Sequence, residues 1–574
     1  MTNKLILVCS YPILRSTGWQ LVLNAVVMQT NIRILPIVLA FLWTIPADPT
    51  AKALTPPPDG GYPNFNTAEG QNALKSLTSG SGNTAVGWAS LFSTAGASFN
   101  TGIGAGTLAL NTADRNTATG AAALLLNTGG IQNTANGASA LLHNEVGSFN
   151  TAVGDSALFD NTSGLANTAI GVESLVANTT GAFNTGVGNG ALLDNTTGSN
   201  NTATGTGALG ANTTADDNTA TGFQALFNNA IGTRNTATGA RALSKNTDGG
   251  DNTATGIEAL FSNTTGFGNT ADGDGALTSN IDGDRNTGVG LAALGFNSAG
   301  NDNTAVGAGA LSVNDIGIEN SAIGSGALES NAGDHDTAVG KDALNSNTVG
   351  LQNTALGFSA LFSNIMGTNN TAVGNIALLN SLGDSNTAIG ASAGINVTTA
   401  SNAICIGIPG QNVSNSCFIG NVFATTSAGG IGVLVNASGQ LGTTTSSRRF
   451  KENLKPMEHA SEALYGLKPV SFRYTKEIDP AGVSQFGLVA EDVEKVNPDL
   501  IVRDEEGKPY SVRYDQVNAM LLNEFLKEHQ KTEAQQKQID ALTTQLQQQE
   551  ARIQKISDRI GMTNMTAQFA GTGQ

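Results

Sequence analysis

The chain has 574 residues, of which 40% are hydrophobic, 13% are charged and 71 are glycine. The length allows about three or four ordinary domains, but low charge and abundant glycine are unlike a helical bundle or a typical α/β enzyme. The net charge of −17 argues against a general nucleic-acid-binding protein, because no basic excess exists to displace phosphate counterions.

Residues 1–53 differ in composition from the rest and have the pattern of an export signal. The apolar run Ile34–Trp43 follows Arg33, and Ala51-Lys52-Ala53 provides a small-x-small cleavage site. Met28 lies just upstream, so we expect the natural start there, followed by a signal peptide to residue 53. The apolar run is short for a membrane span of about 20 residues, and an uncleaved anchor is the alternative interpretation.

Export would leave two cysteines in the mature chain, Cys405 and Cys417. Their spacing is not a zinc pattern, and no histidine accompanies them. An exported protein can form disulfides. A disulfide, within one chain or between chains, and a pair of buried thiols both agree with the sequence.

A repeat of 17 residues fills residues 66–394, after a linker at 54–65. The motif Asn-Thr-Ala-x-Gly starts 20 times between Asn66 and Asn386, at sixteen intervals of 17 residues and three of 16. Repeat position 5 is Gly in all 20 copies, and position 9 is Leu in 19. Position 1 is Asn in 19 copies, with Asp336 as the exception.

One copy of the repeat suits one coil of a β-solenoid, with two short strands and two turns. The Gly at position 5 indicates a corner or a close backbone approach. We expect the Leu residues of successive coils to stack into an apolar column, and the Asn residues at position 1 to form a hydrogen-bonded ladder. The predicted fold class is therefore mainly β, a β-roll or β-solenoid.

The rhythm of the repeat resembles the left-handed β-roll of trimeric autotransporter adhesin heads, which implies a trimer. Such a rod would act as a spacer, display loops for adhesion, or both. Stacked Thr columns also occur on ice-binding solenoids, but that reading requires the Thr at position 2 to face outward rather than inward. No acidic Gly-Asp nonapeptide pattern of a calcium-binding roll is present.

Residues 395–445 break the period but remain rich in Gly, Val and Ser, and we interpret them as a β-rich neck. At Ser446 the composition changes, and charged and aromatic residues become frequent. The new module contains four characteristic segments: SSRRFK (Ser446–Lys451), ALYGLKPVSFRY (Ala463–Tyr474), FGLVAEDVEKVNPDLIV (Phe486–Val502) and YSVRYDQVNAMLLNEF (Tyr510–Phe525).

These segments resemble the intramolecular chaperone auto-processing domain that ends phage endosialidases and tail fibres. The resemblance covers roughly 446–560 and places the domain itself at 446–514. It implies a trimeric chaperone that aligns three chains and then cuts itself off. Carried over, Ser446 is the nucleophile, Lys451 is its base, and the cut separates Thr445 from Ser446.

A serine hydroxyl needs an adjacent base to act as a nucleophile. The cationic side chains of Arg448 and Arg449 would favour a neutral Lys451, or would hold an oxyanion. The family has an Asp at the position that Ser447 occupies in this chain. The Ser447 hydroxyl is also a candidate to replace Ser446 as the nucleophile. The alternative is that Ser446 and Lys451 lie in a solvated loop as ordinary side chains with no catalytic role.

No motif places His459 or His529 near the Ser-Lys pair, and both are interpreted as structural. Residues 515–560 contain no Gly or Pro and are predicted to form a coiled-coil helix, followed by a disordered tail at 561–574. Its heptad seam runs through Leu521, Phe525, Thr532, Ile539, Leu542, Leu546, Ile553, Ile556 and Ile560. Polar residues interrupt this seam, so one amphipathic helix packing on its own domain is the alternative.

The sequence predicts an exported, secreted or cell-surface homotrimeric fibre with a self-cleaving C-terminal chaperone. Its expected partners are its own copies and, as an open possibility, a surface glycan. No nucleic acid, cofactor, metal or membrane span in the mature chain is expected. The alternative is an adhesive or structural fibre whose C-terminal domain stays attached as a trimerisation cap. A hydrolase acting on an external glycan is disfavoured, because no paired-carboxylate insertion interrupts the repeats.

Overall fold

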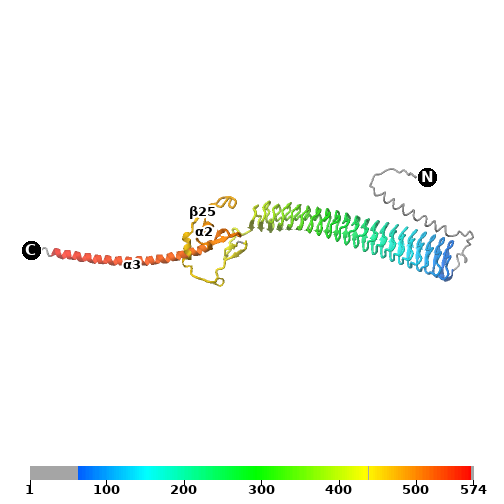
Figure 1. The fold of residues 1–574 in the computed structure, drawn as a ribbon, viewed down its shortest axis with the longest axis horizontal. Coiled ribbons are helices and arrows are strands. Elements are labelled where there is room, and N and C mark those ends of the chain that lie inside the picture. The colour runs from blue at the N-terminus through cyan, green and yellow to red at the C-terminus, as the bar shows by residue number, and fades with distance from the viewer. Residues whose placement is uncertain (1–61, 437, 570–574) are drawn as a thin grey trace, which may run out of the picture. The chain divides into compact units, whose positions relative to one another are not determined.

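The structure is a computed structural model that describes residues 62–436 and 438–569, with side chains as far as Met562. The chain divides after Ala424 into two compact units. Figure 1 shows the first as a stack of coils and the second as a small domain with a long helix, α3. The predicted signal peptide, Met28 and most of the linker at 54–65 lie outside the described residues.

The first unit is a solenoid, as predicted, in which each repeat contributes one short strand to a single parallel sheet. Neighbouring strands pair in register one repeat apart, for example Thr236 with Thr253 and Thr238 with Thr255. A short 3-10 turn, η1 (Pro63–Phe65), precedes the first strand. The repeat strands are β1 (Thr67–Glu69), β2 (Thr84–Val86), β3 (Thr101–Ile103), β4 (Thr117–Thr119), β5 (Thr134–Asn136), β6 (Thr151–Val153), β7 (Thr168–Ile170), β8 (Thr185–Val187), β9 (Thr202–Thr204), β10 (Thr219–Thr221), β11 (Thr236–Thr238), β12 (Thr253–Thr255), β13 (Thr270–Asp272), β14 (Thr287–Val289), β15 (Thr304–Val306), β16 (Ser321–Ile323), β17 (Thr337–Val339), β18 (Thr354–Leu356), β19 (Thr371–Val373) and β20 (Thr387–Ile389).

The second strand predicted for each coil is not formed in the described repeats, and turns take its place. In the segment of each coil where the second strand was predicted, two residues adopt left-handed backbone conformations, as in Glu258 (φ 53°) and Leu260 (φ 52°). Such residues interrupt the extended geometry of a strand. The coils are nevertheless hydrogen-bonded here, because the Leu260 N–H donates to the Ala276 carbonyl at 2.9 Å.

The core of the solenoid consists of stacked small residues and leucines. In the coil that starts at Asn252, Ala254, Ala259 and Leu260 are fully buried. The predicted leucine column is thus confirmed. Gly256, at position 5, has φ +132°, and an added Cβ would lie 2.3 Å from the Gly273 carbonyl oxygen of the next coil. The invariant glycine therefore allows the backbones of adjacent coils to meet.

Two asparagine ladders run along the solenoid, one of which was predicted. In the predicted ladder, the Asn252 N–H donates to Asn235 Oδ1 at 3.0 Å, and its Nδ2 donates to the Gly266 carbonyl at 2.8 Å. In the second ladder, Asn263 Nδ2 donates to Asn246 Oδ1 at 2.8 Å and to the same Gly266 carbonyl. Asn occupies this position 12 in 16 of the 20 copies, a signal that the sequence analysis missed.

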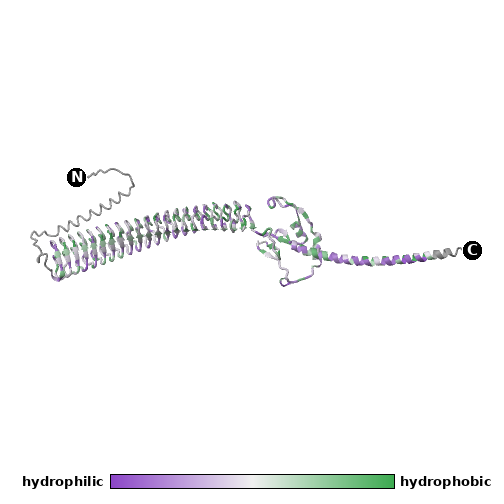
Figure 2. Ribbon diagram, turned by 180° about the vertical axis from the view of Figure 1, so that it is seen from behind, coloured by the Kyte–Doolittle hydropathy of each residue, from purple (hydrophilic) through white to green (hydrophobic). Residues whose placement is uncertain are grey.

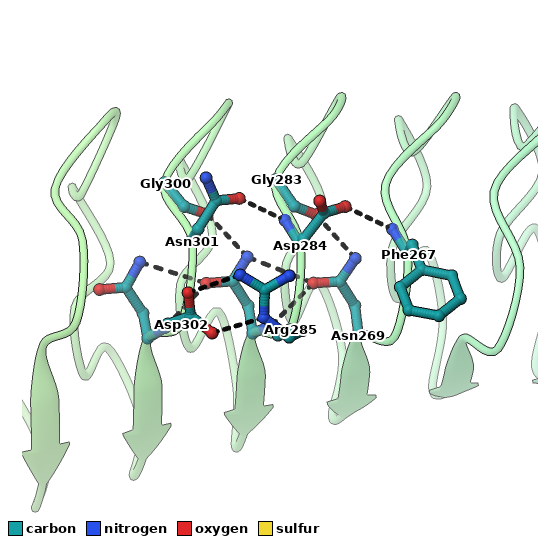
Figure 3. A network of polar contacts seen from close by, with 10 residues as sticks. Phe267, Asn269, Gly283, Asp284, Arg285, Gly300, Asn301 and Asp302 are labelled. Atoms are coloured by element: carbon teal, nitrogen blue, oxygen red, sulfur yellow. Dashed lines mark hydrogen bonds and ion pairs between the residues drawn. The ribbon is translucent and has the colours of Figure 1, made fainter.

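The corner next to the first ladder carries side chains that bridge adjacent coils (Figure 3). Asp284 Oδ1 accepts the Phe267 N–H at 2.9 Å, and Arg285 pairs with Asp302 at 2.7 Å. These bonds lie on the outside of the solenoid. They make this corner a charged and exposed surface.

The threonines at position 2 face outward rather than inward. In β12 the central Ala254 is buried, whereas Thr253 and Thr255 are exposed. Because strand side chains alternate between faces, the residues at positions 2 and 4 of every coil share one outer surface. We call this surface the strand face.

The solenoid continues beyond the repeats into the segment predicted as a neck. Strands β21 (Ala403–Ile406) and β22 (Ser416–Ile419) extend the same parallel sheet. Cys405 is buried and Cys417 is exposed, and both are free thiols. Cys417 lies opposite Ile404, one residue out of step with Cys405, so the two thiols point to opposite faces. In the single chain the two thiols are thus apart and only Cys405 is buried, and the predicted disulfide stays a prediction.

The second unit is a small α+β domain joined to a long helix. A hairpin of β23 (Val433–Val435) and β24 (Leu441–Thr443) leads into the domain, where β25 (Val470–Phe472) pairs with β26 (Gln485–Gly487) and β27 (Ile501–Arg503) pairs with β28 (Pro509–Val512). The helices are η2 (Arg448–Phe450), η3 (Glu458–Gly466), α2 (Ala490–Val496), η4 (Pro498–Leu500) and α3 (Tyr514–Phe569). Its small core contains Val493, Leu500, Ile501, Val512, Val517 and Met520.

The helix predicted at 515–560 is present as α3, which has 56 residues. It continues through Gly561 to Phe569, where the sequence predicted a disordered tail. Its ribbon is mostly hydrophilic, with apolar residues at intervals along it (Figure 2). The apolar members of the predicted seam are all more than half exposed: Leu521, Phe525, Ile539, Leu542, Leu546, Ile553, Ile556 and Ile560.

Candidate functional site

The predicted Ser-Lys pair comes together immediately after β24. The 3-10 turn η2 is closed by the Phe450 N–H, which donates to the Ser447 carbonyl, and by the Lys451 N–H, which donates to the Arg448 carbonyl, each at 3.1 Å. This turn reverses the chain. Lys451 Nζ therefore returns to Ser446 and donates a hydrogen bond to its Oγ at 3.1 Å.

Thr445, Ser446 and Lys451 are all exposed in the single chain. A hydroxyl hydrogen-bonded to an amine can lose its proton to that amine when the amine is neutral. Because Ser446 Oγ belongs to the residue that follows the Thr445 carbonyl, it is also within covalent reach of that carbonyl. The arrangement contains a nucleophile, a potential base and a peptide bond to attack.

The two arginines beside the pair are placed differently from the lysine. The Arg449 guanidinium lies over the Phe450 ring, 4.5 Å from its centroid. Arg448 forms part of the η2 turn. Ser447 occupies the N-cap of this turn, but its side chain makes no capping hydrogen bond.

A second serine, Ser461, is fully buried and contacts a lysine, and sequence reasoning missed it. Its Oγ hydrogen-bonds to Glu524, accepts from Asn523 Nδ2 at 2.7 Å and lies 3.3 Å from Lys527 Nζ. Tyr465 donates to the other oxygen of Glu524 at 2.8 Å. These residues are about 60 positions apart in the sequence, and only the packing of η3 against α3 brings them together.

Charge at this cluster argues against a catalytic role for Ser461. Lys527, together with Ser461 and Tyr465, lowers the pKa of Glu524 to about 2. The hydrogen bond that Lys527 Nζ donates to Glu524 Oε1 in turn raises the pKa of Lys527. A lysine held in its protonated form is not a base, so the cluster serves to attach η3 to α3.

The two histidines of the second unit lie against glutamates of their own helices. His459 Nδ1 is 2.6 Å from Glu462 Oε1, and His529 Nε2 is 3.3 Å from Glu533 Oε1. Both pairs are exposed helix-surface contacts. They agree with the structural role that the sequence analysis assigned to these histidines.

Asp336, the exception in the first asparagine ladder, is the buried acid of the solenoid. Its Oδ1 accepts the Asn353 N–H at 2.8 Å, and its Oδ2 accepts Asn347 Nδ2 at 2.8 Å. Burial raises the pKa of this carboxyl from 3.8 to about 7, although these hydrogen bonds oppose the shift. The sequence marked the position as unusual but did not show that its side chain is buried.

Among the described residues, no group of three or more His, Cys, Asp or Glu side chains is arranged to hold a metal ion. In the same part of the chain, no helix is long and apolar enough to cross a membrane.

Comparison with protein families matches residues 446–502 to a peptidase family described as chaperone of endosialidase. The match begins at Ser446 and includes Lys451, and it agrees with the predicted resemblance. The C-terminal module is thus similar to the chaperone of endosialidase and follows a long β-solenoid. Searches of curated proteins and of solved structures find no match to the chain.

Proposed function

We propose that this chain is an exported homotrimeric fibre protein whose C-terminal module assembles three chains and then cleaves the bond between Thr445 and Ser446. The observation that carries the proposal is the 3.1 Å hydrogen bond between Lys451 Nζ and Ser446 Oγ, at the first residue of the matched family segment. The solenoid is the mature protein that remains after cleavage, and the C-terminal module serves to assemble it.

The cleavage is a single intramolecular event. Ser446 Oγ attacks the Thr445 carbonyl carbon while Lys451, in its neutral form, takes the hydroxyl proton. The C–N bond then breaks, and the proton passes to the departing α-amino group of Ser446. The Thr445 carbonyl is then joined to Ser446 Oγ in an ester. Water hydrolyses the ester to give the Thr445 carboxylate and restores the serine hydroxyl.

Exposure of the pair in one chain supports a requirement for assembly. A lysine becomes a base at neutral pH only when burial or nearby cations disfavour its charged form. Neighbouring copies would exclude water from Ser446 and Lys451 and bring Arg448 and Arg449 close to the developing oxyanion. Cleavage would then follow trimer formation.

The exposed seam of α3 supports self-association. An isolated helix is stabilised mainly by packing of its apolar face, yet Leu542, Leu546 and Ile553 are 60% or more exposed in the single chain. A parallel coiled coil of three copies would bury these side chains. The predicted coiled coil is therefore part of the proposed assembly.

The alternative function is a fibre whose C-terminal module never cuts. Ser447, in place of the family Asp, favours it. Against it, the hydrogen bond between Lys451 and Ser446 forms with serine at position 447, whose side chain makes no capping hydrogen bond in η2. The Ser-Lys pair therefore comes together without the family Asp.

Intact mass of the expressed chain tests the proposal. We expect cleavage to release residues 446–574, and Ser446→Ala and Lys451→Met to leave the chain whole. Ser447→Ala is the matched control, because it removes the neighbouring hydroxyl and should still be cut. Sedimentation should show all four proteins as trimers. An uncut wild-type trimer would establish the permanent cap, and a cut Ser446→Ala chain would exclude Ser446 as the nucleophile.

A further inference from the structure

The strand face of the solenoid is unusually poor in charge. Among the 40 residues at positions 2 and 4 of the 20 repeats, only Glu69 and Asp272 are charged. By contrast, the last two positions of the repeats, at the corner shown in Figure 3, carry 12 charged residues. Charged residues are depleted at the cores of protein interfaces. The strand face has far fewer charged residues than that corner, as expected of an interface.

Position 4 forms an unbroken apolar column at the C-terminal end of the solenoid. From β14 to β22, nine consecutive strands place an aliphatic residue on this face, and parallel pairing aligns them. These residues are Val289, Val306, Ile323, Val339, Leu356, Val373, Ile389, Ile406 and Ile419. At a strand spacing of about 4.8 Å the column is roughly 40 Å long.

The column is exposed in the single chain. Val306 is 37% exposed, and Ile323, Leu356 and Ile389 are each 46% exposed. Contiguous apolar patches of this kind are rare on soluble monomers and mark interaction surfaces. Towards the C-terminal end the patch broadens, because Ile404 replaces the threonine of position 2 and is 41% exposed.

We infer that the strand face is the surface through which copies of this chain pack against one another, with the column from β14 to β22 as its dry part. The inference rests on the proposed homotrimer and adds which surface forms it. Three identical solenoids around a three-fold axis have the same pitch, so their columns match coil by coil. The C-terminal module follows the continuous column in the sequence, and its proposed trimer would keep the three chains parallel.

The same face contains a polar block. In β9 to β12 position 4 is threonine, and in β13 it is Asp272. Five consecutive coils therefore offer hydroxyls or a carboxylate instead of aliphatic side chains, and carboxylates of three copies would repel in a dry core. This block stays hydrated, between the dry column and the apolar strands β6 to β8.

Variants with one introduced cysteine test the inference, in a chain that carries Cys9→Ser and Cys417→Ser so that the buried Cys405 is the remaining native thiol. Val306→Cys places a thiol in the dry column. Val313→Cys is the matched control, because it changes the same residue type in the same coil, is 49% exposed and lies on another side. Thr238→Cys probes the polar block.

We expect all variants to sediment as trimers. Mild oxidation should link Val306→Cys chains into covalent dimers, and a maleimide should label Val313→Cys but not Val306→Cys. A small charged thiol reagent should label Thr238→Cys at least tenfold faster than Val306→Cys. The unmodified chain gives a further check, since its native Cys417 lies on the strand face and should form the same cross-links.

The outcomes separate this inference from the proposed function. A trimer in which Val306→Cys is freely labelled and not cross-linked would overturn the inference, leave the homotrimer standing and free the strand face for an external ligand such as ice. Equal protection of Val306→Cys and Thr238→Cys would overturn the division into dry and hydrated parts. A monomer would refute the homotrimer itself.

Discussion

Replacement of Asp336 by asparagine should stabilise the solenoid in a pH-dependent way. Asparagine occupies this ladder position in 19 of the 20 repeats. In other coils the amide Nδ2 donates to a backbone carbonyl, as Asn320 does to Gly333 at 2.8 Å. An ionised Asp336 has no proton to donate, and it is buried without a cation among its hydrogen-bond partners.

The magnitude follows from the raised pKa of Asp336. The carboxyl titrates near 3.8 in the unfolded chain and at about 7 in the folded one. The folded state therefore binds the proton more tightly, and stability is lost as the pH rises from the lower to the higher value. Three pKa units correspond to about 4 kcal/mol. Asp334, a nearby acid, adds slightly to the shift.

Urea unfolding of the wild type and Asp336→Asn should thus give similar stability near about pH 4 and a growing advantage of the variant up to about pH 8. Hydrogen exchange of the Asn353 amide, which donates to Asp336, should report the same change locally. Asp334→Asn is the control, since it removes a partly exposed charge and keeps an acceptor for the Ile318 N–H. An advantage of Asp336→Asn that is equal at both pH values would refute the reasoning.

Three further predictions concern the stacking of coils and the attachment of η3 to α3. Leu260→Ala should cost about 2–5 kcal/mol in urea unfolding, because Leu260 is fully buried, whereas Leu291→Ala, at a 60% exposed site, should cost little. Gly256→Ala should expose the amides of its own and the next coil to hydrogen exchange, since its Cβ would overlap the Gly273 carbonyl; unchanged protection would contradict this. Glu524 has a pKa of about 2, below its ordinary 4.5. Its ionised side chain therefore stabilises the second unit at pH values above 4.5, and this stabilisation is lost as the pH falls towards 2. Glu524→Gln should therefore flatten the acid dependence of the helical circular dichroism signal, and an unchanged acid profile would count against the cluster.

The repeat is the part of the fold that the sequence predicts best. A solenoid coil contacts only its neighbours, so each residue type recurs wherever the same contact recurs. The buried Leu260, the close approach at Gly256 and the ladder through Asn252 could all be predicted for this reason. The second ladder, through Asn263, was equally visible in the periodicity and was missed.

The candidate site was predicted in part. Ser446 and Lys451 are five positions apart, and one tight turn decides whether their side chains meet, so local sequence was sufficient. The contact of Ser461 with Glu524 is different, because it depends on how η3 packs against a helix that begins about 50 residues later. No local pattern carries that information.

The sequence by itself determined the period, the inward leucine and the break in composition at Ser446, because these depend on contacts that repeat or lie close together in the chain. Only the tertiary structure decided the path of each coil and the direction of its side chains. Left-handed residues such as Leu260 replace the expected second strand, and strand alternation turns Thr253 outward and Ala254 inward. These outcomes depend on how a whole coil closes on its neighbour, and a one-residue shift in that closure exchanges the buried face with the exposed one.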